Sequence, residues 1–242
     1  MSAPDLQRTF TGEIPRNYDQ FLGPAWFSRH SAELARLMPA DPGGDVLEIA
    51  CGTGLFTEHL RKRLDPRRRL VATDLSAAML DYARAKLASL EGITWQTADA
   101  GKLPFADGEF AAITCSFGVM FVPDRKAAFS EARRVLAPGG RFVFNVWDRI
   151  EDNPCALTYE EVIERMFPGD KDCTSGSLTC WRMSGWCAGS WTTRDSPPGE
   201  SRRCACRCKC PRVISPLGRC AGRRAGSCSR SAAWNSMTRS AR

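Results

Sequence analysis

Apolar residues in the first 150 positions form short runs that alternate with amphipathic segments. Five short apolar runs predict buried strands at 45–50, 69–74, 93–97, 110–116 and 141–147. Between them, apolar residues at helical spacing predict helices at 55–64, 77–90 and 124–136. Because strands alternate with helices, we predict an α/β fold with a doubly wound, mainly parallel, Rossmann-like sheet. Such sheets bind ligands at the carboxyl ends of their strands.

Composition divides the chain into two parts. Residues 1–170 carry 3 of the 12 cysteines and a net charge of −4, whereas residues 171–242 carry 9 cysteines and a net charge of +11. The second part has only four Leu, Ile, Val or Phe residues, too few to bury a core that offsets chain entropy. We therefore predict a folded domain over 1–170 and a disordered Cys/Arg/Ser-rich tail over 171–242. The tail resembles GC-rich coding DNA read in a shifted frame, and we interpret it as an aberrant C-terminus.

Two functions of the tail are weighed against this interpretation. The cysteines at 204, 206, 208 and 210 alternate with other residues, which is not the usual spacing of zinc ligand pairs, and the tail contains no histidine. We therefore expect no metal site. Nucleic acid is not an expected partner, except through non-specific attraction to the basic tail.

The chain shows no segment that predicts membrane insertion or export. Its longest nearly apolar run, 110–122, is interrupted by polar residues and is too short to span a bilayer. The N-terminus lacks a basic stretch followed by an apolar one. These features predict a cytoplasmic protein.

A glycine turn and an acidic residue follow the first two predicted strands. Gly52-Thr53-Gly54 opens the helix after the first strand, where glycines let the backbone turn sharply and approach a ligand. Asp74 lies 20 residues after Gly54, at the end of the second strand, and can accept hydrogen bonds from ribose hydroxyls. Together they predict a site for a cofactor that contains ribose.

Two residues help to choose among such cofactors. Thr57 occupies the position where a dinucleotide fingerprint has its third glycine, which disfavours a nicotinamide cofactor without excluding it. Glu48, within the first strand, suits a ligand with a positive group better than a pyrophosphate. Since an unpaired buried carboxylate is costly, we expect Glu48 to have a partner. No G-x4-G-K-[ST] motif is present, which excludes a P-loop nucleotidase by this signature.

Five consecutive segments resemble the successive motifs of class I S-adenosylmethionine-dependent methyltransferases, in the right order and spacing. They are VLEIACGTG (46–54), ATDLS (72–76), TADA (97–100), CSFGVMFVPD (115–124) and RVLAPGGRFVFNVW (134–147). The ubiquinone/menaquinone-biosynthesis-like small-molecule branch is the most similar. Residues 18–24 resemble the helix that covers the cofactor in that branch. The resemblance extends over about residues 14–170 and implies methyl transfer from S-adenosylmethionine to a small-molecule acceptor.

The resemblance also implies a role for individual residues. Glu48 and the backbone at Ala50, Gly52 and Gly54 would hold the methionine part of the cofactor, and Ala50 stands where the family usually has glycine. Asp74 would bind the ribose, and Tyr18 would close over the site. The adenine contacts would be Leu75, Met79, Asp99 and Ala100, and the floor beside the sulfonium would be Cys115, Ser116 and Phe117.

Other reactive side chains are assigned structural roles. We expect Cys51 to be a small buried residue, and we expect the two histidines, His30 and His59, to be surface or packing residues of helices. No residue is named as a general base, so the acceptor atom stays open, as does the oligomeric state. Two alternatives remain: a nicotinamide-dependent oxidoreductase, and a non-catalytic binding module with a nucleic-acid-binding tail.

The resemblance raises a question about completeness. The family fold normally has two more strands after the fifth, ending in an antiparallel hairpin, and nothing after residue 170 predicts either strand. We therefore expect these C-terminal strands to be missing and the edge of the fifth strand to be unpaired. On this ground we predict that the chain as written is unstable or inactive.

Overall fold

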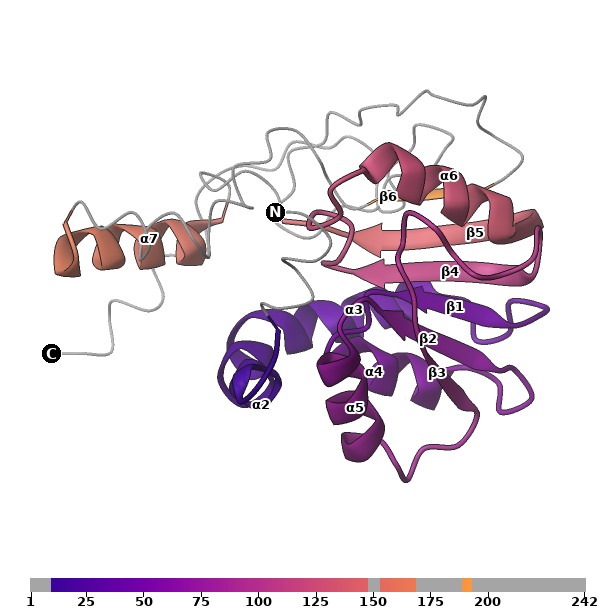
Figure 1. The fold of residues 1–242 in the computed structure, drawn as a ribbon, viewed down its shortest axis with the longest axis horizontal. Coiled ribbons are helices and arrows are strands. Elements are labelled where there is room, and N and C mark those ends of the chain that lie inside the picture. The colour runs from indigo at the N-terminus through magenta and orange to yellow at the C-terminus, as the bar shows by residue number, and fades with distance from the viewer. Residues whose placement is uncertain (1–9, 148–152, 169–188, 193–242) are drawn as a thin grey trace, which may run out of the picture.

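The computed structural model describes residues 10–147, 153–168 and 189–192, and these form a doubly wound α/β sheet with flanking helices (Figure 1). The strand order is β3-β2-β1-β4-β5-β6, and the first five strands are parallel. The strands are β1 (Val46–Ile49), β2 (Leu70–Asp74), β3 (Ile93–Thr97), β4 (Phe110–Ser116), β5 (Leu136–Asn145) and β6 (Gly189–Thr192). The predicted fold class is confirmed.

The helices lie before, between and after the strands along the chain. They are α2 (Ile14–Asn17), the π-helix η1 (Tyr18–Phe27), α3 (Ser28–Leu37), α4 (Leu55–Arg63), α5 (Ala77–Lys86), α6 (Arg125–Val135) and α7 (Pro154–Met166), the last of which projects away from the sheet (Figure 1). The predicted helices after the first, second and fourth strands are all present. Helix α5 ends at Lys86, four residues before the predicted end at Leu90. Its predicted cap is confirmed, because the Ser76 hydroxyl accepts a hydrogen bond from the amide of Met79 at 3.3 Å.

The fifth strand begins earlier than we predicted. Leu136 already pairs with Phe110, and an irregularity in β4 and β5 then brings Ala112 opposite Arg141. Gly139, in the left-handed region with a φ of 79°, lies within this irregular stretch. The Pro-Gly-Gly segment thus lies inside the strand instead of separating it from α6. The strand also ends at Asn145 and not at Trp147.

The prediction that both C-terminal strands are missing is wrong for one of them. Strand β6 pairs antiparallel with β5, and Arg141 to Phe144 face Thr192 to Gly189. This pairing covers part of the edge that we expected to be open. The sequence did not predict it because a four-residue strand with one apolar side chain has no detectable period. The predicted disorder of the rest of the tail falls outside the described residues.

Each face of the sheet packs against its own helices. On one face Leu47, Ile113 and Phe142 pack with residues of α6 that include Ala132 and Val135. On the other face the strands pack against α3 and α4, and Ala72 packs against Leu80 of α5. The cluster between the strands and helices α3 and α4 contains Val46, Leu70, Ala112, Val143, Leu34, Phe56 and Leu60. The central strands β1, β2 and β4 are therefore buried on both faces, and the strand ends are left as the place for a ligand.

The N-terminal helices are tied to this core. The ammonium of Lys86 in α5 donates to the carboxylate of Asp19 in η1 at 2.6 Å, and the hydroxyl of Tyr82 donates to the same carboxylate at 3.3 Å. At Gly23 the chain runs so close to α4 that a Cβ would lie 2.9 Å from Leu55 Cδ1. Segment η1 is therefore packed beside the start of α4, which immediately follows the glycine turn.

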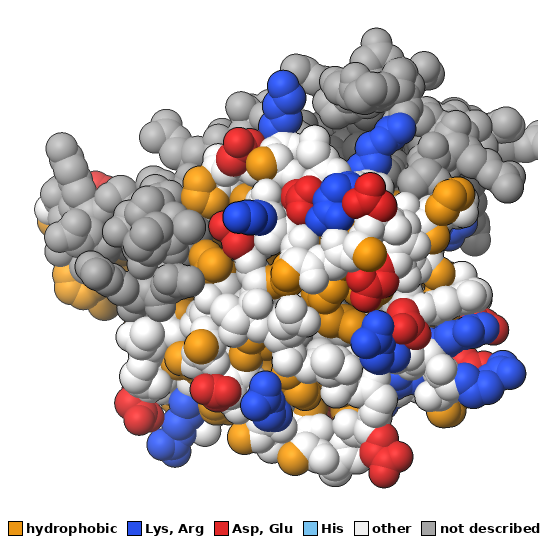
Figure 2. Space-filling view, turned by 45° about the vertical axis from the view of Figure 1, so that its right-hand side comes forward, with side chains coloured by type: hydrophobic (Ala, Val, Ile, Leu, Met, Phe, Trp, Pro, Cys, Tyr) orange, Lys and Arg blue, Asp and Glu red, His pale blue; other side chains and the backbone are white. Residues whose placement is uncertain are grey.

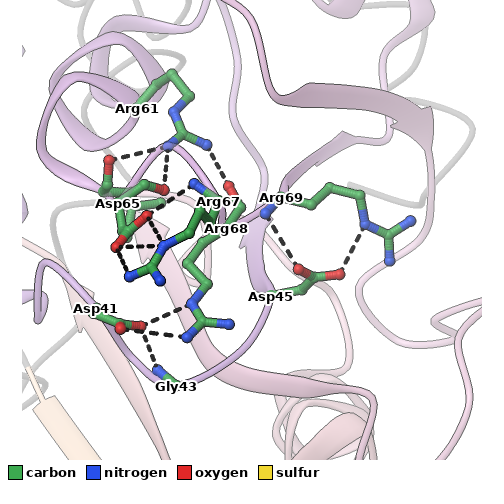
Figure 3. Close-up of polar contacts among 9 residues, drawn as sticks. Asp41, Gly43, Asp45, Arg61, Asp65, Arg67, Arg68 and Arg69 are labelled. Carbon is green, nitrogen blue, oxygen red and sulfur yellow. Dashed lines mark hydrogen bonds and ion pairs between the residues drawn. The ribbon is translucent and has the colours of Figure 1, made fainter.

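A polar network lies at the amino ends of β1 and β2, away from the glycine turn (Figure 3). The buried guanidinium of Arg61 donates to the backbone carbonyls of Leu64 at 3.0 Å and Asp65 at 2.8 Å, and also to that of Arg68. Three Asp–Arg pairs surround it: Asp41–Arg68, Asp45–Arg69 and Asp65–Arg67. Because its donors are satisfied by protein carbonyls, this network holds the loop between α4 and β2.

Charged side chains of both signs are interspersed over the face drawn in Figure 2. No area of a single sign dominates that face, which agrees with the small net charge of residues 1–170. No helix within the described residues is long and apolar enough to cross a membrane.

Candidate functional site

The glycine turn at the carboxyl end of β1 adopts a conformation that few residues tolerate. Ala50, Gly52 and Gly54 all have positive φ angles, of 55°, 55° and 75°. A Cβ at Gly54 would lie 2.9 Å from Leu87 Cδ1, so this glycine allows the turn to pack on α5. A Cβ at Gly52 would have no neighbour within 4 Å. The turn is thus packed on one side and open on the other, where a ligand can approach its backbone.

Asp74 joins this turn to the end of β2. One carboxylate oxygen accepts from the amide of Gly52 at 2.8 Å, and the other accepts from the amide of Ser76 at 2.8 Å. Burial raises the pKa of Asp74, and these backbone hydrogen bonds offset part of the rise. The carboxylate is therefore held in one orientation between two strand ends, and its remaining lone pairs can accept from ligand hydroxyls.

Glu48 is a carboxyl group buried in the middle of the fold. Its exposed fraction is 1 %, and within the described residues neither of its oxygens has a hydrogen-bond partner. Burial raises its pKa to about 8, and the nearby Thr57 side chain offsets part of that rise. Thr57 thus acts on Glu48 without a regular hydrogen bond, and no cationic partner of Glu48 lies among the described residues. A buried carboxyl group left in this state favours a positively charged ligand group.

Further polar atoms near Glu48 also lack partners. Thr114 lies opposite Glu48 in the register of β1 and β4, and its hydroxyl is buried without a hydrogen bond among the described residues. The hydroxyls of Thr53, in the glycine turn, and Thr57, in the first turn of α4, are also buried without a hydrogen bond among the described residues. Since buried polar atoms normally pair, this group of atoms indicates a place where a ligand or water supplies the missing partners.

The predicted adenine-binding residues lie around the ends of β2 and β3. The amide of Ala98 donates to the carbonyl of Asp74 at 3.0 Å, which joins these two strand ends. Asp99 is exposed, and its carboxylate accepts from the amide of Gly101 at 2.8 Å. Met79 is buried, whereas Leu75 and Ala100 are half-buried. These side chains thus lie with Asp74 at the carboxyl ends of the strands.

The predicted floor residues at the end of β4 differ in exposure. Cys115 is fully buried, and burial raises the pKa of its thiol to about 12, so its side chain faces the core and is unreactive. Ser116 is half-buried. Phe117 is buried with a φ of 56°, and its amide donates to the side-chain oxygen of Asn145 at 2.9 Å. Non-glycine residues in this conformation often occur at functional sites.

An aromatic cluster, which sequence reasoning did not find, surrounds Phe117. Phe117 stacks on Trp147 with ring centroids 4.5 Å apart, and Phe27 packs edge-on against Phe117 with centroids 5.3 Å apart. Tyr18, the predicted lid residue, stacks on Phe27 at 5.3 Å. We call this group the aromatic cluster; its members are Tyr18, Trp26, Phe27, His30, Phe117 and Trp147. It places the π-helix η1 next to the carboxyl ends of β4 and β5.

Some missed residues carried a signal and others did not. Asn145 interrupts the apolar run at 142–147, and this break in the pattern could have marked it. His30 and Trp147 are far apart in sequence, and only the fold brings their rings together, at 5.4 Å. Cys51 is buried, as predicted; among the described residues it forms no disulfide, and burial raises the pKa of its thiol.

The described residues contain no group of three or more His, Cys, Asp or Glu side chains placed to hold a metal ion. What they do bring together is a glycine turn open to a ligand, a fixed carboxylate at Asp74, an unpartnered carboxyl group at Glu48 and an aromatic cluster. This arrangement suits a ligand that has hydroxyl groups at one end and a positive group at the other.

Comparisons with known proteins find relatives for the central part of the chain. Residues 46–140 match the family described as "Methyltransferase domain". A demethylmenaquinone methyltransferase of Staphylococcus aureus is 35% identical over 133 residues, which cover 54% of this chain and 55% of that protein. The chain thus matches only about half the length of these curated relatives.

The fold also has a relative among solved structures. A protein from Methanococcus maripaludis, described as a candidate S-adenosyl-L-methionine-dependent methyltransferase, matches with a TM-score of 0.51 and 20% identity. The match covers 66% of this chain and 74% of that chain. At this identity the likeness concerns the fold alone.

Proposed function

We propose that this chain transfers a methyl group from S-adenosylmethionine to a small-molecule acceptor, because residues 46–140 match the family described as "Methyltransferase domain". The observation that carries the proposal is the unpartnered, buried carboxyl group of Glu48 beneath a glycine turn whose other end is fixed by Asp74. A cofactor with an ammonium group and a ribose would satisfy both carboxyl groups.

The residues divide the binding of this cofactor between them. Glu48 would pair with the ammonium group, and the open side of Gly52 would let the backbone approach the methionine part. Asp74 would accept from the ribose hydroxyls, since the backbone already orients it. The remaining predicted cofactor contacts are Tyr18, Ala50, Gly54, Leu75, Met79, Asp99, Ala100, Cys115, Ser116 and Phe117.

The bound cofactor supplies a methyl group that is already activated on a sulfonium. The chain therefore has to hold the acceptor in line with it and exclude water. The aromatic cluster supports this role, because Phe117 and Trp147 close the carboxyl ends of β4 and β5. Segment η1, packed at Gly23 against Leu55, would cover the cofactor as the resemblance implies.

We further propose that the acceptor is an aromatic hydroxyl compound of the quinol type. Two observations support this: the curated relatives are demethylmenaquinone methyltransferases, and the aromatic cluster offers ring faces and edges to a planar ligand. We also propose that the chain works in the cytoplasm, where thiols such as those of Cys51 and Cys115 stay reduced.

The nicotinamide alternative gains no support from the geometry. Thr57 fills the position of the third fingerprint glycine, and its side chain is fully buried. Binding of nucleic acid by the tail concerns residues outside those described.

Calorimetric titration with S-adenosylhomocysteine tests the proposed cofactor. The wild-type chain should bind near the micromolar range, about −8 kcal/mol, and Asp74→Ala should weaken binding by about 100-fold, or about 2.7 kcal/mol. The control is Asp81→Ala, which removes an exposed carboxylate from α5 and should bind like the wild type. A folded wild-type chain that does not bind, or equal binding by wild type and Asp74→Ala, contradicts the proposal.

A further inference from the structure

His30 belongs to the aromatic cluster. Its ring meets Trp147 edge-on at 5.4 Å and Phe117 at 5.7 Å, so α3 places the imidazole beside the carboxyl ends of β4 and β5. Phe117 directly follows Ser116, the last residue of β4, and Trp147 follows β5 by two positions. The imidazole therefore lies at the carboxyl ends of the strands, where we propose that methyl transfer takes place.

The surroundings leave the ring nitrogens of His30 available. Among the described residues, no hydrogen bond or ion pair occupies either nitrogen, and the side chain is half-buried. The neighbouring rings of Trp26, Phe27 and Trp147 are also half-buried. A planar ligand that lies against these rings would meet one group able to accept a proton near neutral pH.

The charge state of His30 suits that task. Burial lowers its pKa below the usual 6.5; Arg29 lowers it further, and Glu33 raises it. These two charged residues lie on α3 itself, whereas Phe117 and Trp147, which pack against the imidazole from the strand ends, are uncharged. At neutral pH the imidazole is therefore mostly neutral and can accept a proton.

We infer that His30 is the general base that removes the hydroxyl proton of an aromatic acceptor as the methyl group is transferred. This inference rests on the proposed function and goes beyond the sequence analysis, which assigned His30 to packing and named no base. It also commits the acceptor to one that carries an ionisable hydroxyl group.

The proposed step balances without another reactant. The acceptor O–H bond breaks, and its proton moves to a nitrogen of His30. The electron pair left on oxygen then forms the new bond to the methyl group. In the alternative, that pair moves into the ring and the adjoining ring carbon forms the bond. The carbon–sulfur pair stays on sulfur, which becomes neutral; the imidazolium then returns its proton to water. After attack by carbon, the ring also releases its own proton to water.

The test uses the full chain with naphthohydroquinone as the acceptor probe. His30→Gln should lower kcat by about 100-fold, as expected for loss of a general base. It should leave the affinity for S-adenosylhomocysteine unchanged and remove the acid limb of the kcat/KM pH profile. His30→Phe retains a ring in the cluster without a proton acceptor and should show the same loss. His59→Gln, which changes the other histidine of the chain, should behave like the wild type.

A second readout does not depend on turnover. In the His59→Gln chain His30 is the only histidine, so its imidazole proton signal can be followed by NMR. Its titration midpoint should lie below 6.5, and addition of naphthohydroquinone should shift the signal. An imidazole that serves packing alone would not respond to the probe.

The outcomes separate the two proposals. Equal turnover in wild type, His30→Gln and His30→Phe overturns the role of His30 and leaves the proposed function intact. Binding of S-adenosylhomocysteine without methylation of the probe or a shift of the imidazole signal overturns both the quinol-type acceptor and the His30 assignment. A folded wild-type chain that neither binds S-adenosylhomocysteine nor transfers methyl overturns the proposed function and this inference with it.

Discussion

At the scale of single residues, Glu48 shows how burial sets up binding. The fold holds this carboxyl group away from water without giving it a hydrogen bond from the described residues. Its pKa is raised to about 8 from the usual 4.5, so the ligand-free fold keeps a proton that the unfolded chain loses. A cationic ligand reverses this preference, because it stabilises the ionised form.

We predict two effects of Glu48→Gln. Stability of the ligand-free wild type should fall as pH rises from 4.5 through about 8, and the variant should lose that part of the pH dependence. Its affinity for S-adenosylhomocysteine should fall by about 100-fold, because the charged partner is lost. Denaturant unfolding across this pH window and calorimetry measure the two effects.

The control for this variant is Glu91→Gln, which alters an exposed carboxylate in the loop before β3. Calorimetry of the wild type in two buffers of different ionisation enthalpy adds a further check. At neutral pH, binding should release a proton as Glu48 ionises beside the ligand. Binding by Glu48→Gln at wild-type affinity would contradict the assignment.

Ala50 and Gly118 are in close contact in the fold although they lie far apart in the sequence. Ala50 has the left-handed φ of 55°, and a Cβ at Gly118 would overlap the Ala50 methyl group. The alanine that replaces the family's usual glycine is thus accommodated in part by a glycine on the loop after β4. This is a non-local compensation, which inspection of the turn alone could not reveal.

We predict that Ala50→Gly raises the free energy of unfolding by about 1 kcal/mol, because it relieves the left-handed conformation. Gly118→Ala should destabilise the wild-type chain by about 1–3 kcal/mol through overpacking. The same change should cost less in the Ala50→Gly chain, although Cys115 Sγ, 2.7 Å from the added Cβ, still resists it. Denaturant unfolding of the four chains measures the coupling, and additive effects would refute it.

At the scale of elements, an ion pair and a hydrogen bond connect η1 to α5. Asp19 and Lys86 have side chains that are 15% and 22% exposed, so their ion pair is less screened than the surface pairs. Burial and Asp19 raise the pKa of Tyr82, which keeps its hydroxyl protonated and able to donate. These contacts hold the N-terminal segment next to the glycine turn.

We predict that Lys86→Met speeds dissociation of S-adenosylhomocysteine by about tenfold, or about 1.4 kcal/mol, because it frees η1 from α5. The melting temperature should change little. Lys62→Met breaks the exposed Lys62–Glu58 pair on α4 and is the matched control. Stopped-flow displacement gives the rates, and equal rates in the two variants would show that the Asp19–Lys86 pair does not control release.

Element prediction succeeded where local signals were strong. Strands β3 and β4 have the predicted bounds, since the turn at Asp107-Gly108 and the flanking polar residues delimit them. The start of β5 was missed, because a Pro-Gly-Gly segment is typical of a turn. In the fold that segment is paired through an irregular stretch opposite β4. Tertiary pairing here outweighs turn propensity.

At the scale of the whole molecule, β6 lies beyond the expected end of the domain. The sequence predicts a domain over 1–170, yet β6 at Gly189–Thr192 adds a sixth strand to the sheet beyond that limit. We propose that the folded unit requires β6, since the strand pairs with the exposed edge of β5 from Arg141 to Phe144. The predicted instability of the chain assumed that this edge was open.

Two truncated chains test this proposal. A chain that ends at residue 170 should aggregate, because the edge of β5 loses its antiparallel partner. A chain that ends at residue 192 retains β6 and should stay monodisperse. Size-exclusion chromatography with light scattering compares them, and identical behaviour of both would show that β6 is dispensable.

The sequence by itself determined the succession of strands and helices along the chain, the glycine turn and the acidic residues at 48 and 74. These features are encoded by periodicity and turn chemistry within a few consecutive residues. Only the tertiary structure decided that Glu48 has no cationic partner among the described residues, that Ala50 depends on Gly118, that His30 joins an aromatic cluster and that β6 pairs with β5. Each of these facts depends on contacts between residues distant in the chain, for which local sequence carries no signal.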